Sequence, residues 1–120
     1  MTVHSKLGSG FPEVIYQRAM SIEMDKQGLE NNSEVTMPIF YDDIKIGARR
    51  VDSFVESKVL AEYKATTELK DNHLAQAINN LEAFNLEIGL LINFGAKSLE
   101  FKRVINSKML EKNKKLMKSS

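Results

Sequence analysis

The feature that most constrains the fold is the continuous apolar run at residues 88–92, which follows a segment with helical spacing at residues 71–84. A short apolar run of this kind is typical of a strand that is buried on both faces of a sheet. A strand-like segment at residues 58–64 precedes the helical one. Because a strand, a helix and a buried strand in succession form a βαβ unit, we predict a right-handed crossover between two parallel strands.

The rest of the chain predicts one further helix and several strands. Pro12 suits the first turn of a helix and Gly28 its end, so a helix is expected over residues 12–27. The glycines within residues 1–10 predict a flexible loop there. The other expected elements are strands at 34–41, 44–47, 49–55 and around 99–105, with a turn at Asp42-Asp43. The order α-β-β-β-α-β with an extra C-terminal strand predicts an α/β sandwich with a mixed sheet.

The length of 120 residues predicts one domain, which we place at residues 1–106, followed by a basic tail at residues 107–120. The net charge is +1, but the segment from Lys108 to the end carries five Lys and one Glu, so residues 1–107 sum to −3. The domain therefore lacks the bulk positive charge of a nucleic-acid-binding surface. The tail is either a solvated end or a source of phosphate contacts.

The absence of Cys excludes a disulfide scaffold, a thiol nucleophile and thiolate zinc sites, and it fits a reducing cytosol. The longest apolar run is too short to span a bilayer, and the N-terminus has no apolar signal-peptide core. We therefore expect a cytoplasmic protein with no membrane partner.

The residues that could carry chemistry are Asp52, Glu62 and Lys64. On a strand, Glu62 and Lys64 point to the same face because side chains alternate with a period of two. Two carboxylates suit a hard divalent cation such as Mg²⁺ or Mn²⁺, which acidifies a bound water and polarises a phosphodiester. The lysine can position that water or stabilise developing charge, and the backbone carbonyl of Tyr63 could complete the shell of the metal.

The strand register decides whether Asp52 joins this group. A two-residue loop at 56–57 would pair Val55 with the residue after the loop and place Asp52 on the wrong face. A three-residue loop at 56–58 pairs Val55 with Val59 and sets Asp52 opposite Glu62. We predict the second register, because it gathers one apolar face made of Val51, Val55, Val59 and Tyr63.

Several blocks of the sequence resemble a known nuclease family. Asp52 followed by Glu62-x-Lys64 and a helix matches the PD-(D/E)XK nuclease signature. Gly10-Phe-Pro-Glu13-Val-Ile-Tyr16 resembles the motif of the bacterial and archaeal GxxExxY proteins within that superfamily. Further similar blocks are Ala61-Glu-Tyr-Lys-Ala65, His73-Leu-Ala-Gln76 and Gly89-Leu-Leu-Ile-Asn-Phe-Gly95. The resemblance covers residues 4–106 and departs at Val51, where proline is usual, and at Tyr63, where an aliphatic residue is more usual.

The resemblance implies a metal-dependent nuclease that hydrolyses phosphodiester bonds of nucleic acid, with DNA expected before RNA. It implies that Asp52 and Glu62 bind the metal, that Glu13 joins them from the first helix, and that Lys64 is the catalytic lysine. Gln76 would reach in from the second helix. Many nucleases of this kind dimerise, so a homodimer is also expected. The alternative is a non-catalytic nucleic-acid-binding or protein-assembly module that retains the fold.

Each of these residues also has a simpler interpretation. Glu62 and Lys64 could form a surface ion pair, and Glu13 could interact only with the helix dipole. Tyr16 could bond to Glu13 or pack in the core. His73, Gln76 and Asn80 form a polar stripe at i, i+3 and i+7. His73 suits a cap, with a base or a second metal ligand as the alternative, and Gln76 suits a solvated position. In the segment Asn93-Phe94-Gly95 we expect a turn, with Gly95 at positive φ, and a substrate-facing loop is the alternative.

Overall fold

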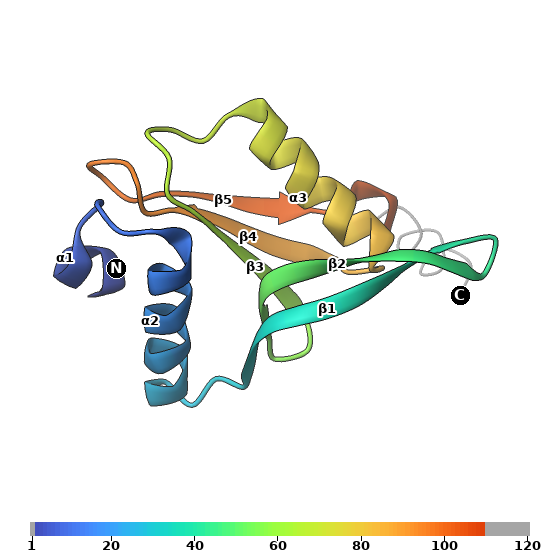
Figure 1. Cartoon of the computed structure of the whole chain (residues 1–120), viewed down its shortest axis with the longest axis horizontal. Coiled ribbons are helices and arrows are strands. Elements are labelled where there is room, and N and C mark those ends of the chain that lie inside the picture. Colours follow the sequence, from blue (N-terminus) through green and yellow to red (C-terminus); the bar gives the residue numbers. More distant parts are fainter. Residues whose placement is uncertain (1, 110–120) are drawn as a thin grey trace, which may run out of the picture.

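Five strands form one mixed sheet in the order β1-β2-β3-β4-β5, flanked by helices (Figure 1). The computed structural model describes residues 2–109 of the chain. The elements are α1 (Thr2–Leu7), α2 (Glu13–Lys26), β1 (Asn31–Tyr41), β2 (Ile44–Val55), β3 (Val59–Lys64), α3 (Asp71–Ala83), β4 (Ile88–Asn93) and β5 (Glu100–Ile105). The predicted α/β class, the mixed sheet and the extra C-terminal strand are confirmed.

The predicted βαβ unit is present at the centre of the sheet. Strands β3 and β4 pair in parallel from Val59↔Ile88 to Lys64↔Asn93, and α3 connects them. The other neighbouring strands pair antiparallel. Because β3 and β4 run in the same direction, their carboxyl ends and the loops that follow lie at one edge of the sheet.

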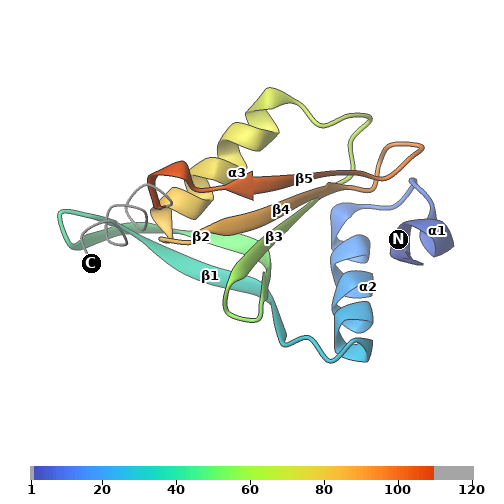
Figure 2. The same ribbon diagram turned by 180° about the vertical axis from the view of Figure 1, so that it is seen from behind.

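Helices α2 and α3 lie on opposite sides of the sheet (Figure 2). An apolar core lies between each of these helices and the sheet. On one face, Tyr16 and Met20 of α2 pack against Tyr63 of β3. On the other, Leu81 of α3 packs against Leu60 of β3. Alternation along β3 therefore sends Tyr63 toward α2, and Leu60, Glu62 and Lys64 toward α3.

The N-terminus differs from the prediction. Residues 2–7 form a helix, not a loop, and Gly8 (φ 73°) follows it. Val3 of this helix is buried against α2. A six-residue helix is stabilised by tertiary packing rather than by propensity, so its own sequence carries too little periodicity to reveal it. The end of α2 is as expected: Gly28 takes a positive φ of 74° directly after the last turn.

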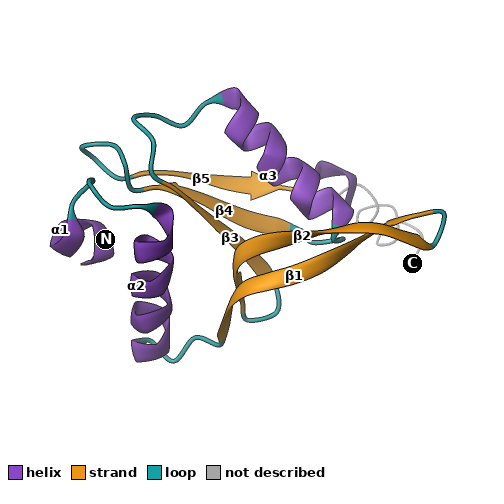
Figure 3. Cartoon of the chain, in the orientation of Figure 1, coloured by secondary structure: helices purple, strands orange, loops and turns teal. Residues whose placement is uncertain are grey.

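Strands β1 and β2 form a long hairpin whose distal part projects from the domain (Figure 3). The predicted turn at Asp42-Asp43 is confirmed, with both residues at positive φ as a two-residue hairpin turn requires. The two separate strands expected at 44–47 and 49–55 are one strand, because Gly47 and Ala48 continue the pairing with β1. The pairing between β1 and β2 shifts its register between Ile39 and Phe40.

The chain after β5 remains attached to the domain through Asn106, which is 3% exposed and donates to the carbonyls of Leu81 and Leu86. The predicted basic tail lies outside the described residues from position 110 onward. No helix within residues 2–109 is long and apolar enough to cross a membrane.

Candidate active site

The site forms where β2 separates from β3. The predicted register is confirmed, since Val55 pairs with Val59 across a three-residue loop. The β2–β3 pairing in the described chain ends at Ser53↔Ala61, one step before Asp52 and Glu62. The two strands therefore form a fork at the position where the sequence places its carboxylates.

One predicted detail is wrong. Val51 does not share a face with Tyr63: it packs with Leu60 under α3, whereas Tyr63 packs under α2. The reason is a change of direction in the hairpin at Asp52. Its neighbour on β1, Glu34, has a positive φ of 55° and is skipped between the pairs that flank it, Ser33↔Ser53 and Val35↔Val51. Simple alternation along β2 therefore fails at the fork.

Asp52 reaches directly into β3. Its Oδ2 accepts a hydrogen bond of 2.8 Å from the backbone N–H of Tyr63, the residue between Glu62 and Lys64. The carbonyl of Lys64 accepts from Phe94 on the β4 side, so the N–H and C=O of Tyr63 both point toward β2. Because the β2 ladder has already ended, the Tyr63 carbonyl faces the fork beside Asp52.

Glu62 is buried, at 8% exposure, and accepts a hydrogen bond on Oε1 from Nδ2 of Asn80. Asn80 is 2% exposed, and its Oδ1 accepts a bond of 2.5 Å from Nη1 of Arg49 on β2. Sequence reasoning did not assign a role to Asn80 or Arg49. The polar stripe of the helix contained the signal for Asn80, because a polar residue beside apolar neighbours on a packed helix needs a partner.

Lys64 is half-buried and stands on the same face of β3 as Glu62. The ion pairs within residues 2–109 are Lys26–Glu23, Arg50–Glu34 and Lys108–Glu82. The simple interpretation of Glu62 and Lys64 as an ion pair is therefore not what this part of the chain shows. Glu62 instead has a neutral amide as its partner.

The opposite face of β3 is held by Tyr63, which is fully buried and donates a 2.8 Å hydrogen bond to Ser53 Oγ. The pKa of Tyr63 is raised from 10.0 to about 12, chiefly by burial. The Ser53 hydrogen bond acts in the opposite direction, and the negative charge of Asp52 adds to the increase. Tyr63 is thus a neutral packing residue whose backbone, not its ring, faces the fork.

The other predicted site residues lie on helices α2 and α3. Glu13 is the exposed first residue of α2, and Gln76 is exposed on α3, one turn before Asn80. Tyr16 packs in the core: its ring stacks on Phe94 at 4.5 Å between centroids, and its hydroxyl donates to the Gly8 carbonyl at 2.6 Å rather than to Glu13. His73 accepts from the N–H of Lys70 at 2.9 Å, which is the expected cap role.

The loops at the carboxyl ends of β3 and β4 are joined by Asn93, which is fully buried. Its Oδ1 accepts from the N–H groups of Thr66 and Gly95, each at 3.0 Å, and its Nδ2 donates to the Thr66 carbonyl at 2.9 Å and to Glu100 at 2.9 Å. The expectation of a positive φ at Gly95 is wrong. Gly95 is required for close approach instead, because a Cβ there would overlap the backbone of Thr66 and Ala65.

The oxygen atoms at the fork fit a hard divalent cation. They comprise a carboxylate from Asp52, a carboxylate from Glu62 and the carbonyl of Tyr63, and Mg²⁺ prefers such oxygen donors together with waters and substrate phosphates. Within residues 2–109, no cluster of three His, Asp or Glu side chains is placed to hold one ion. Glu13 is therefore not brought together with Asp52 and Glu62 in this structure.

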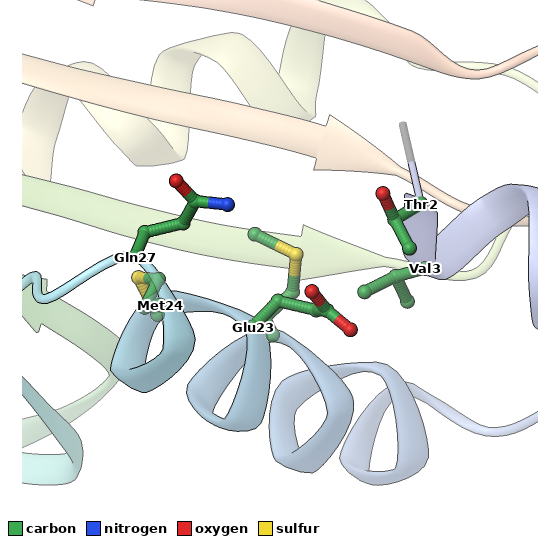
Figure 4. A pocket seen from close by; sticks show the side chains of 6 residues that line it. Thr2, Val3, Glu23, Met24 and Gln27 are labelled. Atoms are coloured by element: carbon green, nitrogen blue, oxygen red, sulfur yellow. The ribbon is translucent and has the colours of Figure 1, made fainter.

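A cavity of 190 Å³ lies between α1 and α2, away from the fork, and is lined by Thr2, Val3, Met20, Glu23, Met24 and Gln27 (Figure 4). Its one carboxylate, Glu23, lies 3.5 Å from the amine of Lys26. This cavity lacks the pair of acidic side chains that the fork supplies.

The mixed five-stranded sheet with its flanking helices is consistent with the fold of the PD-(D/E)XK nucleases. The family model of the PD-(D/E)XK nuclease superfamily matches residues 1–104, and the chain belongs to this superfamily.

The crystal structure of the protein SSO0001 is similar in fold, with a TM-score of 0.57 and 18% identity over 82% of this chain. The match covers 55% of that protein, so this chain spans about half of its length. None of the curated proteins compared with the chain matches it significantly.

Proposed function

We propose that this protein is a metal-dependent nuclease that hydrolyses phosphodiester bonds, with DNA as its substrate and Mg²⁺ or Mn²⁺ as its cofactor. One observation carries the proposal: Asp52 bonds to the backbone between Glu62 and Lys64, at the fork of a sheet of the PD-(D/E)XK superfamily. Asp52, Glu62 and the Tyr63 carbonyl would hold the metal. A divalent cation there would acidify a water and polarise the scissile phosphate.

The protein side chains have separate tasks in this proposal. Lys64 stands on the strand face of Glu62 without an ion-pair partner within residues 2–109, so its amine is available to orient water or to stabilise the charge that develops on phosphate. Glu13 and Gln76 are included in the proposed site from the family resemblance, and both side chains are exposed. We assign the chain to the GxxExxY family and expect it to act in the cytoplasm as a homodimer.

The test is cleavage of labelled single-stranded, duplex and branched DNA and of RNA, with Mg²⁺ or Mn²⁺ and with EDTA. Lys64→Ala should abolish metal-dependent cutting. Lys58→Ala, an exposed lysine just before the same strand, should leave it unchanged. Equal cutting by wild type and Lys64→Ala would refute the assignment. No cutting by wild type, together with metal-independent and salt-dependent binding that survives Glu62→Gln, would establish the non-catalytic binding module instead.

A further inference from the structure

Asn80 and Arg49 connect the candidate catalytic strand to the projecting hairpin. Asn80 is buried on α3, between Glu62 of β3 and Arg49 of β2. The part of β2 that precedes Ser53, residues 44–52, does not pair with β3 in the described chain. The hydrogen bonds through Asn80 therefore link the two strands where their backbones have separated. The three residues form one chain of donors and acceptors from an exposed arginine to a buried carboxylate.

The chemistry of an amide gives Arg49 a specific role. An asparagine side chain presents an acceptor at Oδ1 and donors at Nδ2, and the two can be exchanged by rotation of the amide. A guanidinium only donates, so Arg49 fixes Oδ1 toward itself. The same rotation then directs Nδ2 toward Glu62, which as a carboxylate only accepts. Arg49 and Glu62 thus favour the same orientation of the amide, and without Arg49 only the bond to Glu62 would restrain its rotation.

We propose that Arg49 and Asn80 are positioning residues that hold one oxygen of Glu62 and leave the other directed to the metal site. This inference rests on the proposed function of Glu62 as a metal ligand. Side chains that hydrogen-bond to metal ligands typically alter metal affinity by ten- to a hundredfold when they are removed. Asn80 acts on Glu62 directly, and Arg49 acts through the orientation of Asn80.

The chain offers matched controls for both residues. Arg50 is adjacent to Arg49 but lies 3.7 Å from Glu34 on β1, so it is directed away from Asn80. Asn79 is adjacent to Asn80 and exposed. Arg49→Lys keeps a pure donor at the position and should preserve the amide orientation, whereas Arg49→Met keeps the length of the side chain and removes the donor.

The first measurement is Mn²⁺ affinity by calorimetry on the full chain. Arg49→Met and Asn80→Leu should each weaken binding about tenfold, with Arg49→Lys close to wild type. Arg50→Met and Asn79→Leu should change nothing. Equal weakening by Arg49→Met and Arg50→Met would overturn the proposal, because it would show a general effect of charge rather than positioning.

The second measurement needs no metal and separates failure of this inference from failure of the nuclease assignment. In NMR spectra, one side-chain amide proton of Asn80 should exchange slowly with solvent, because it is bonded to buried Glu62. Arg49→Met should make this exchange faster, because only the bond to Glu62 then holds the amide, and Arg49→Lys should keep it slow. If no protein, including the wild type, binds Mn²⁺, while the Asn80 amide exchanges slowly in the wild type and faster in Arg49→Met, only the metal site is refuted. Fast exchange in the wild type, or protection unchanged in Arg49→Met, would refute the positioning role itself.

Discussion

The side chain of Asn93 connects the two loops that follow β3 and β4 by hydrogen bonds. Its removal should therefore lower the free energy of unfolding by an amount that can be worked out from these bonds. Asn93→Ala deletes the bonds from the N–H groups of Thr66 and Gly95 and the bond to the Thr66 carbonyl. Each such bond contributes about 1 kcal/mol net, so the three together predict a loss of about 3 kcal/mol. The fourth bond, to the partly exposed Glu100, is left out because solvent replaces much of it.

Equilibrium urea unfolding followed by circular dichroism measures this loss as a lower midpoint at unchanged slope. Asn72→Ala, an exposed substitution near the start of α3, is the matched control and should change stability by less than about 0.5 kcal/mol. A loss below about 1 kcal/mol for Asn93→Ala would show that the loops are held by something other than this side chain. A reduced slope would instead indicate a change in the compactness of the folded or unfolded state.

Further predictions concern the packing at Gly95 and the ionisation of Tyr63. Gly95→Ala should destabilise the protein by about 3 kcal/mol because its Cβ would meet the backbone of Thr66, whereas Gly47→Ala, with open space around it, should cost less than about 0.5 kcal/mol in the same urea assay. The raised pKa of Tyr63 should make the protein lose about 2–3 kcal/mol of stability as the pH rises from 10 to 12. The sign follows because the unfolded state releases the Tyr63 proton near pH 10 while the folded state retains it to about pH 12. Tyr63→Phe should flatten that part of the pH profile; an equally steep profile would exclude Tyr63 as its source.

The parts of the fold that follow from local pattern could be predicted from the sequence. The buried run at 88–92 specified β4, and the hydrophobic alternation across the 56–58 loop selected the register that pairs Val55 with Val59. Helix α1 escaped prediction because six residues carry no periodicity, and its stability comes from the burial of Val3 against α2. The role of Gly95 was misjudged because close backbone approach and positive φ both select glycine, and only three-dimensional contacts distinguish them.

The candidate site shows the same division. Period-two alternation on β3 correctly placed Glu62 and Lys64 on one face, since both residues belong to a regular strand. The same rule failed for Val51, because the hairpin changes direction at Asp52 and Glu34. Asn80 and Arg49 could not be paired from sequence, because the two residues are 31 positions apart and meet only when α3 packs on the sheet. Local rules therefore identify the carboxylates, whereas tertiary packing decides which groups position them.

The break in the β2–β3 ladder creates the chemistry of the fork. In a continued antiparallel ladder, a strand partner on β2 would bond to both the N–H and the C=O of Tyr63. Here the carboxylate of Asp52 takes the N–H, so the side chain replaces the strand as the partner and remains anchored against β3. The carbonyl of Tyr63 is then left facing the same space as Asp52, and the buried Glu62 next to it is held by Asn80. One interruption of strand pairing thus leaves a side-chain carboxylate and a backbone carbonyl at the fork, beside the strand that carries Glu62. In the proposed nuclease, this fork would let one strand supply both a side-chain and a backbone ligand to the metal.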